Sequence, residues 1–404
     1  MSAFLDALFL GAGYNAALVA IGAALLGFAG GAAGTFLYLR KRALVSDAVA
    51  HATLPGIGLA FIVMVGSGGD GRSLLGLLLG SAVSAWLGLL AVQWLTRRTR
   101  LNEDAAIGAV LSVFFGAGVV VLTIIQTMAS GRQAGLEGFL LGTTAGMLFS
   151  DAVLIAVGGA VTVLVTWVLR RPMTLVAFDP DYAAARGYNI SAIDLAMMGL
   201  VMAVTVIGLK IVGLILIVAL LIIPPVTARF WTERADRVLW IAGAIGGVSG
   251  YVGATLSASA PDLPTGPIIV LVAAVLFVFS LLFAPARGIA GAMLRRRGFA
   301  RRVHRRQGLL ALARSEPIHD AYTLRVLVAE GLIRADGVAT DVGRAAAARI
   351  ARDERRWDVA RRLHRDTAQA GRYDGLTPIE EVFTPDEIAA FDAEIGGPVP
   401  AGGA

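Results

Sequence analysis

The stretch that decides the fold lies close to the N-terminus and reads Ser46-Asp47-Ala48-Val49-Ala50-His51-Ala52-Thr53-Leu54-Pro55-Gly56. It opens an apolar run, Ile57 to Val65, that is long enough to lie in a bilayer. Asp47 and His51 are four residues apart, so on a helix they share one face, with roughly 6 Å between their Cβ atoms. A carboxylate and an imidazole are therefore expected side by side in a membrane-embedded helix.

Ionisable side chains inside a membrane are costly, so a functional role is the first hypothesis for Asp47 and His51. A carboxylate with an imidazole suits a divalent transition metal. The alternative is that Asp47 caps its helix and His51 donates to a backbone carbonyl. The sequence allows two depths for Asp47 in the membrane. It lies about 8 Å deeper than Arg42 if the chain between them is helical and about 16 Å deeper if that chain is extended.

Composition indicates a polytopic membrane protein rather than a soluble domain. The chain has 404 residues, of which 57% are apolar and 16% are charged. The absence of cysteine excludes disulfides, thiolate metal sites and cysteine nucleophiles. Residues 1–14 contain neither a basic region nor a small-residue cleavage site, so no cleavable signal is expected.

Apolar segments recur along the first 285 residues and predict about eight to nine membrane-spanning helices. A shorter, glycine-rich segment at 138–149 is expected to form a half-helix. GxxxG pairs such as Gly27/Gly31 and Gly246/Gly250 predict close packing between helices. The predicted segments are 14–38, 48–66, 73–95, 105–130, 151–170, 191–208, 211–228, 238–258 and 266–285.

Loop charge sets the orientation, because basic residues are enriched in cytoplasmic loops. With the N-terminus outside, twelve basic residues fall in cytoplasmic loops and three fall outside, which favours that orientation. The inside set is Arg40, Lys41, Arg42, Arg97, Arg98, Arg100, Arg170, Arg171, Arg186, Arg229, Arg234 and Arg237; the outside set is Arg72, Arg132 and Lys210.

Several polar or helix-breaking residues have more ordinary interpretations. Glu103 begins a helix at the cytoplasmic side, where capping or solvation is expected. Asp194 lies one turn inside its segment and is expected to reach water. Pro224 and Pro225 are expected to break or kink the segment that contains them.

A cytoplasmic loop between two segments contains a predicted short helix, about residues 180–186. Asp179 followed by Pro180 is typical of an N-cap and first turn. Gly187 is typical of a helix stop. Such a helix either docks on another subunit or is an ordered linker.

The composition changes after the last apolar segment. Residues 287–306 contain eight arginines and no acidic residue, which indicates a cytoplasmic anchor facing anionic lipid. Residues 304–395 have helical periodicity, and the order helix, glycine, short hairpin, helix predicts a cytoplasmic winged-helix-like domain. The predicted organisation is a transmembrane domain at 1–286, a basic linker at 287–303, this domain at 304–395 and a disordered tail at 396–404.

Over residues 10–285 the sequence resembles the membrane permease of ATP-binding-cassette importers for zinc, manganese and iron, a type II importer fold. The C-terminal extension is similar, more weakly, to iron-dependent repressors. In that comparison Glu381 stands where a histidine commonly follows a glutamate, which argues against a second metal site. The stretches that carry the permease resemblance are Leu44 to Gly56; Glu103-Asp104-Ala105-Ala106-Ile107-Gly108; Phe178-Asp179-Pro180 with Ala183 to Gly187; Val212-Gly213-Leu214-Ile215-Leu216 with Ile222-Ile223-Pro224; and Leu263-Pro264-Thr265-Gly266.

The resemblance implies that the chain is the permease of an importer that translocates manganese, zinc or iron across the plasma membrane. It implies that Asp47 and His51 face the translocation path and contact the metal. It also implies two ATPase subunits, an extracellular metal-binding protein and a second permease, either identical or related. The implied ATPase coupling loop comprises Phe178, Asp179, Pro180, Ala183, Ala184 and Gly187.

The chain is not expected to be an enzyme, because it contains no GxxxxGK[ST] sequence for binding ATP phosphates. No bound cofactor is expected beyond the transported metal, and the expected surroundings are membrane lipid rather than nucleic acid. For the C-terminal domain, docking on or regulation of the ATPase is favoured over DNA binding. Two other functions are open: a vitamin- or siderophore-type importer permease, and a proton-coupled secondary carrier, which should show inverted repeats.

Overall fold

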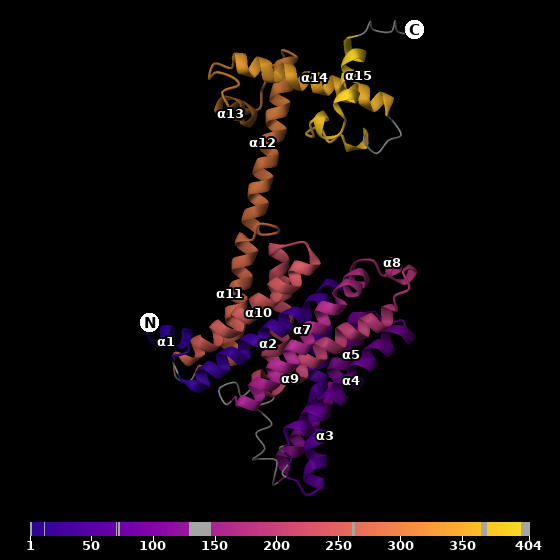
Figure 1. Cartoon of the computed structure of the whole chain (residues 1–404), viewed down its shortest axis with the longest axis vertical. Coiled ribbons are helices and arrows are strands. Elements are labelled where there is room, and N and C mark those ends of the chain that lie inside the picture. The colour runs from indigo at the N-terminus through magenta and orange to yellow at the C-terminus, as the bar shows by residue number, and fades with distance from the viewer. Residues whose placement is uncertain are drawn as a thin grey trace. The chain divides into compact units, whose positions relative to one another are not determined.

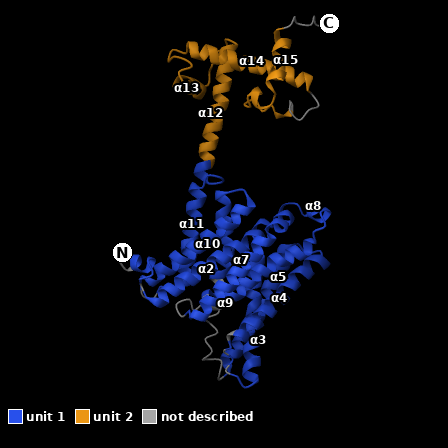
Figure 2. Ribbon diagram, viewed as in Figure 1, with its two compact units in different colours: residues 1–291 blue, residues 292–404 orange. Residues whose placement is uncertain are grey.

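The computed structural model describes residues 2–11, 13–69, 71, 73–128, 147–260, 263–364 and 370–396. It consists of two compact units, unit 1 (Met1–Gly291) and unit 2 (Ala292–Ala404) (Figure 2). Most of the predicted half-helix at 138–149, and the predicted tail beyond Gly396, lie outside the described residues.

The described residues are almost entirely helical or in connecting loops (Figure 1). Their β pairing is limited to one antiparallel bridge, between Ile333 and Ala339. The helices are α1 (Ser2–Leu8), α2 (Tyr14–Leu39), α3 (Leu44–Gly66), α4 (Leu74–Arg98), α5 (Glu103–Thr127), α7 (Phe149–Phe178), α8 (Pro180–Ala185), α9 (Ile190–Trp231), α10 (Ala235–Ala258), α11 (Thr265–Phe283), α12 (Ile289–Ala313), α13 (Ala321–Ala329), α14 (Asp341–Leu363) and α15 (Pro385–Gly396), with 3₁₀ turns at Ala370–Arg372 and Ile379–Glu381.

Within the ranges given above, eight helices are long and apolar enough to cross a membrane. The remaining predicted segment, 211–228, corresponds to a shorter apolar helix, Leu216–Trp231. These helices all belong to unit 1. The prediction of an all-α polytopic membrane protein is therefore confirmed.

The α9 helix reverses direction at Gly213, whose φ of 77° lies in the left-handed region. A methyl group placed on Gly208 would lie 2.8 Å from Cδ1 of Ile217. In a straight helix these two residues would be separated by about 13.5 Å along the axis. The sixth and seventh predicted segments are therefore the two arms of a helical hairpin.

Pro224 and Pro225 were expected to break or kink their segment, and they do not break it. Both prolines lie inside a helix that continues to Trp231. Proline is locked near a φ of −65°, so it cannot adopt the positive φ that this turn requires. Glycine has no Cβ and adopts positive φ readily, so the reversal occurs at Gly213.

The α2 and α10 helices pack backbone against backbone. A methyl group on Gly27 would lie 2.2 Å from the carbonyl oxygen of Gly246, and one on Gly246 would lie 2.1 Å from that of Gly27. One turn further along, Gly31 and Gly250 are equally close to carbonyl oxygens of the facing helix, at 2.3 and 2.2 Å. The predicted close packing through GxxxG pairs is confirmed, since any side chain here would separate the helices.

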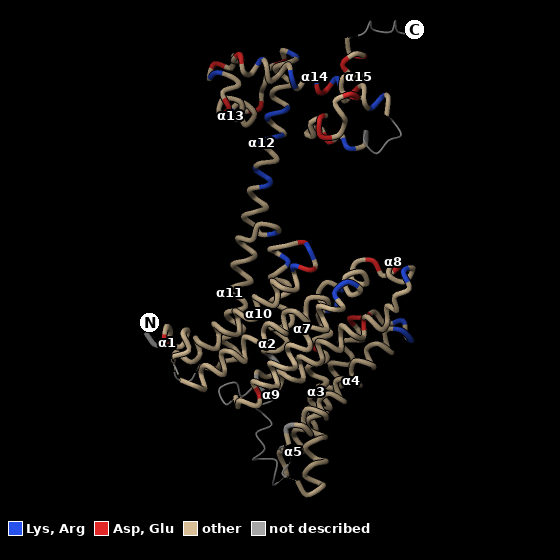
Figure 3. Tube along the Cα trace, viewed as in Figure 1, with Lys and Arg blue, Asp and Glu red and all other residues tan. Residues whose placement is uncertain are grey.

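Charged residues gather at the end of unit 1 where α8 lies (Figure 3). Ion pairs connect loops that the sequence places on the same side of the membrane: Arg42 with Glu103, Arg170 with Asp236, and Arg287 with Glu233. The loops predicted to be cytoplasmic therefore meet one another in space.

Unit 2 is built along α14 and has two apolar clusters. The first joins α12, α13 and α14 through residues that include Leu309, Leu327 and Ala346. The second surrounds the fully buried Trp357 with Phe383 and Phe391. The described part of unit 2 contains the predicted order of helix, tight turn and helix, and its assignment as a winged-helix domain stays a prediction. The predicted basic linker lies mostly within α12.

Candidate metal-ion site

Asp47 and His51 lie on one face of α3, which is helical from Leu44 onward. Asp47 is in the first turn, so the structure has the helical, shallower of the two geometries considered for this pair. The Nε2 atom of His51 is 3.4 Å from Oδ1 of Asp47. The Asp47 side chain is 36% exposed and that of His51 is 19% exposed, so both remain reachable from one side.

The crossing of α3 and α5 fixes the imidazole. At Gly118 of α5, an added methyl group would lie 2.6 Å from Cβ of Leu54, so the two helices approach closely there. Phe115 is three residues before Gly118 and therefore lies on the same face of α5. Its ring meets the His51 ring edge to face, with centroids 5.0 Å apart and an interplanar angle of 79°.

The ordinary interpretation of the pair does not match the structure. The N-cap of α3 is Ala43, without a side-chain cap bond, and Asp47 lies further into the first turn. The Nδ1 atom of His51 is buried and has no hydrogen-bond partner in the described part of the chain. Asp47 is therefore not the cap of α3, and Nδ1 of His51 does not donate to any described carbonyl.

The spacing of the two side chains fits a shared cation. Two ligand atoms about 2.1 Å from one tetrahedral ion are about 3.4 Å apart, which is the separation observed between Nε2 and Oδ1. A complete site needs more ligands, and no group of three or more His, Cys, Asp or Glu side chains that could hold a metal occurs among the described residues. The described residues therefore offer Asp47 and His51 at this place without a third such side chain beside them.

The predicted coupling loop contains the expected short helix, α8. The Oδ1 atom of Asp179 accepts from the backbone N–H of Tyr182 at 2.9 Å, and Pro180 opens the helix. Ala183 is fully buried, Ala184 is exposed, and Gly187 has a φ of 84° just past the end. Three aromatic side chains around α8 are more than 40% exposed: Phe178, Tyr182 and Tyr188.

Sequence reasoning missed an ion network beside the pair. Asp194 was expected to reach water, but its side chain is only 7% exposed and is contacted by both Arg40 and Arg42. Glu103 was expected to cap or to be solvated, but Asn102 caps α5 and Glu103 binds Arg42. The partners are 61 and 154 positions apart in sequence. Only the clustering of opposite charges at segment ends pointed toward this network.

Among the described residues, eight helices long and apolar enough to cross a membrane, with polar residues at one end and a short capped helix in a loop there, are typical of a multi-pass membrane protein. Residues 14–284 match the ABC 3 transport family, ABC-3. The chain belongs to this family: it is a membrane permease subunit of an ATP-binding-cassette transporter, whose ATPase is a separate chain. The family match ends before unit 2.

Similar proteins include two bacterial permeases. The chain is 43% identical over 298 residues to the manganese transport system membrane protein MntC of Bacillus subtilis, covering 74% of this chain and 67% of that protein. It is 37% identical over 284 residues to the zinc transport system membrane protein TroC of Treponema pallidum, covering 70% and 94%. Among solved structures, PsaBC from Streptococcus pneumoniae in complex with Fab matches with a TM-score of 0.60 and 27% identity, covering 71% of this chain and 97% of that chain.

Proposed function

We propose that this permease imports a divalent transition-metal ion, manganese, zinc or iron, and that Asp47 and His51 are its ligands on the translocation path. The observation that carries the proposal is the 3.4 Å approach of His51 Nε2 to Asp47 Oδ1 on an accessible face of α3. Relatives named as manganese, zinc and iron transport proteins support the class of ion. An Asp and His pair suits all three metals, so the choice among them depends on geometry and supply.

The incomplete ligand set has a direct consequence for assembly. Two copies of the permease related by a twofold axis would offer two carboxylates and two imidazoles to one ion, which is a full tetrahedral set. A related permease that supplies the same residue types would serve equally well. We therefore propose that the site forms only where two permeases face each other.

The buried Nδ1 of His51 suits a site that must release its ion. When Nε2 binds a metal, Nδ1 carries the proton, and a tight metal site gives that N–H an acceptor. No described residue accepts from Nδ1. Loss of such a partner typically weakens metal binding about 10–100-fold, and a transport site needs binding that is weak enough to leave.

The driving force comes from the partners. We propose that α8, with its exposed aromatic residues, docks on the ATPase, and that closure of the ATPase dimer displaces α8. An extracellular metal-binding protein would deliver the ion to the opposite face. Metal binding needs an ionised Asp47, which supplies negative charge, and a neutral His51, which supplies a free nitrogen lone pair.

The direct test is uptake of radioactive manganese and zinc by vesicles that contain the complete transporter. Asp47→Ala and His51→Ala should abolish uptake while the protein still inserts in the membrane. Asp104→Ala is the matched control, because Asp104 is an exposed acid in the first turn of α5. Normal uptake by both site variants would refute the ligand roles.

Family membership argues against the proton-coupled carrier, because members are driven by an ATPase. The vitamin- or siderophore-type alternative predicts transport of a bulky chelate that does not depend on Asp47 and His51. Competition between free metal and chelated metal in the uptake assay separates the two.

We also propose that unit 2 is cytoplasmic and docks on or regulates the ATPase. It lies beyond the family match and contains most of the run of arginines that favours the cytoplasmic side. Deleting residues 304–395 should change ATP hydrolysis by the complex and leave metal binding at Asp47 and His51 intact. Binding of the full-length chain to duplex DNA at physiological salt would instead support the repressor-like function.

A further inference from the structure

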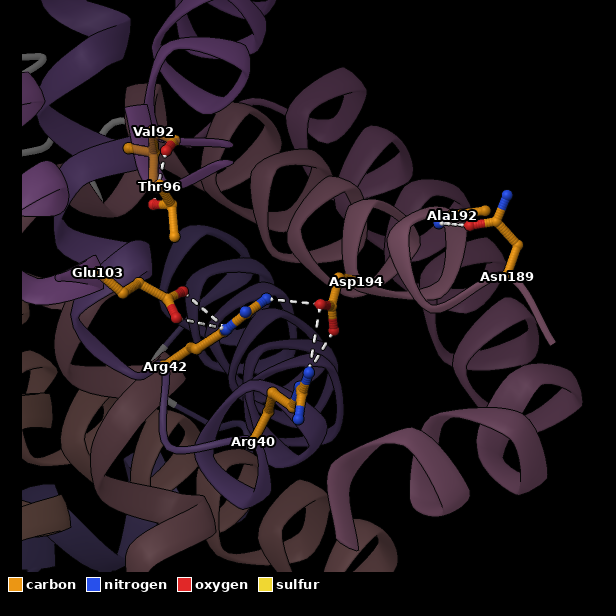
Figure 4. A network of polar contacts seen from close by, with 8 residues as sticks. All are labelled: Arg40, Arg42, Val92, Thr96, Glu103, Asn189, Ala192 and Asp194. Carbon is orange, nitrogen blue, oxygen red and sulfur yellow. Dashed lines mark hydrogen bonds and ion pairs between the residues drawn. The ribbon is translucent and has the colours of Figure 1, made fainter. Parts of the chain in front are cut away.

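The ion network of Arg40, Arg42, Glu103 and Asp194 joins three separate parts of unit 1 (Figure 4). Arg42, in the α2–α3 loop, contacts Asp194 of α9 at 2.8 Å and Glu103 of α5 at 2.6 Å. Arg40, at the end of α2, contacts Asp194 at 3.2 Å. Arg42 is thus the residue through which α5 and α9 are connected to the beginning of α3.

The network is compact and electrically balanced. It contains two guanidinium groups and two carboxylates, with side-chain exposures of 18% for each arginine, 7% for Asp194 and 27% for Glu103. Planar guanidinium groups hold two carboxylates in fixed directions, which a lysine ammonium does not. A cavity of about 70 Å³, lined in part by Arg42, Glu103 and Asp194, lies beside the network. The contacts therefore define a geometry rather than only neutralise charge.

This connection links two regions that the proposed transport cycle uses, the start of α3 and the start of α9 after α8. On one side, the carbonyl of Arg42 accepts from the N–H of Val45 at 3.0 Å, so Arg42 is bonded to the first turn of α3, which also contains Asp47. On the other side, α9 starts only a few residues after α8, at the cap Asn189, and Asp194 is one turn into it. The N–H of Tyr188 donates to the carbonyl of Ala183 at 3.0 Å, which closes the end of α8 two residues before α9 begins at Ile190.

Arg42 also controls the surroundings of the imidazole. Glu103 is the first residue of α5, and the same helix carries Phe115, whose ring packs on His51. One guanidinium therefore holds the first turn of α3 against both α9 and α5.

We infer that Arg42 and Asp194 are positioning residues for transport: their ion pair transmits the displacement of α8 through α9 to α3, so that Asp47 and His51 move when the ATPase closes. This inference rests on the proposed ligand roles of Asp47 and His51. Coupling of this kind requires contacts that link rigid elements, and it is demonstrated by non-additive effects of mutations at the two ends.

The main experiment measures metal uptake and ATP hydrolysis in the same vesicles, with the complete transporter. Arg42→Gln and Asp194→Asn should each lower the uptake per ATP hydrolysed at least about tenfold, while ATP hydrolysis stays within about twofold. Arg42→Lys should recover part of the lost uptake per ATP, because a lysine ammonium can keep one ion pair but cannot hold both carboxylates as the planar guanidinium group does. The double variant should be no worse than the more affected single variant.

Arg170→Gln is the matched control. Arg170 forms an ion pair with Asp236 of α10 at 3.6 Å, among the same cytoplasmic loops, and does not contact α3, α5 or α9 in that pair. It should change the uptake per ATP by less than twofold. The inference is overturned if Arg42→Gln and Asp194→Asn leave the ratio unchanged, if the control lowers it equally, or if the two substitutions act additively.

A second measurement separates this inference from the proposed metal site. The chain has no cysteine, so spin labels can be placed at Leu59→Cys on α3 and Val248→Cys on α10, which are 53% and 50% exposed. ATP should change the distance between the labels, and Arg42→Gln should remove that change, in the absence of metal. A change that persists in Arg42→Gln would overturn the link. If the change depends on Arg42 but Asp47→Ala and His51→Ala transport normally, the ligand roles fail and the mechanical link stands.

Discussion

Two groups of charged side chains lie at the same end of unit 1 and are separated by only a few residues of sequence. In the network of Arg40, Arg42, Asp194 and Glu103, every carboxylate faces a guanidinium within 3.2 Å. In the pair of Asp47 and His51, the contact is 3.4 Å and one imidazole nitrogen is buried without a described partner.

The charges of the network are paired with one another within the fold, whereas those of Asp47 and His51 remain available to a ligand. The network is neutralised when the protein folds, so its members stabilise and connect helices. Holding the two ionisable side chains of Asp47 and His51 near lipid costs free energy, and few contacts within the chain offset that cost. We therefore expect substitutions in the pair to affect transport first, and substitutions in the network to affect stability and coupling.

The largest effect is expected at the pair. His51→Ala should lower metal uptake at least about 100-fold, because it removes one of the two ligand side chains that each chain offers. Its unfolding midpoint in detergent should stay close to that of the unchanged protein, because the imidazole makes few stabilising polar contacts. A large fall in the midpoint would show that His51 is structural and would remove the contrast with the network.

The next largest effect is expected on stability at Asp194. Asp194→Ala leaves Arg40 without its carboxylate and Arg42 with only Glu103. Removing one partner of a buried ion pair costs about 3–5 kcal/mol, and the partial exposure of both arginines lowers our expectation to about 2 kcal/mol. Thermal unfolding of the full-length protein measures this change, with Asp47→Ala as the comparison. Equal stability of the two variants would contradict the distinction drawn here.

A smaller effect is expected at Phe115. Phe115→Leu keeps an apolar side chain but removes the edge-to-face contact with His51. Aromatic contacts of this kind contribute about 0.5–1.5 kcal/mol, so metal binding to the complete transporter should weaken about threefold to tenfold. Equilibrium binding of radioactive manganese measures the change, and unchanged affinity would show that the ring does not orient the imidazole.

The smallest effect is expected at the periphery of this end. Arg170→Gln removes an ion pair with Asp236, whose side chain is 65% exposed. Exposed pairs contribute about 0–1 kcal/mol, so the unfolding midpoint and the uptake rate should both remain nearly unchanged. If Arg170→Gln lowered the unfolding midpoint as much as Asp194→Ala, the stability contributed by an ion pair here would depend on its location at this end of the bundle rather than on its burial.

The sequence predicted those features that depend on local pattern. Hydropathy located the spans, GxxxG spacing predicted close helix packing at Gly27 and at Gly246, and Asp179 before Pro180 predicted the start of α8. Each of these signals lies within a few residues of the structure that it describes. The spacing of Asp47 and His51 likewise placed both side chains on one face, since it depends only on the helical repeat.

The features that the sequence did not predict depend on how distant helices cross. Asp194 meets Arg40 and Arg42, which are more than 150 positions away, and nothing near Asp194 indicates that contact. The contact of Phe115 with His51 requires the close crossing at Gly118. Pro224 and Pro225 were expected to break or kink their segment, because proline is the usual helix breaker, but the helix continues through both of them to Trp231.

The glycine seam between α2 and α10 bears on how the rest of unit 1 can move. Backbone atoms touch there without intervening side chains, so the two helices have no rotamers through which to adjust their spacing. Sliding one past the other would bring carbonyl oxygens into collision within a fraction of a turn. These two helices therefore move as one body, and any alternation of access has to come from movement between this pair and the helices around it.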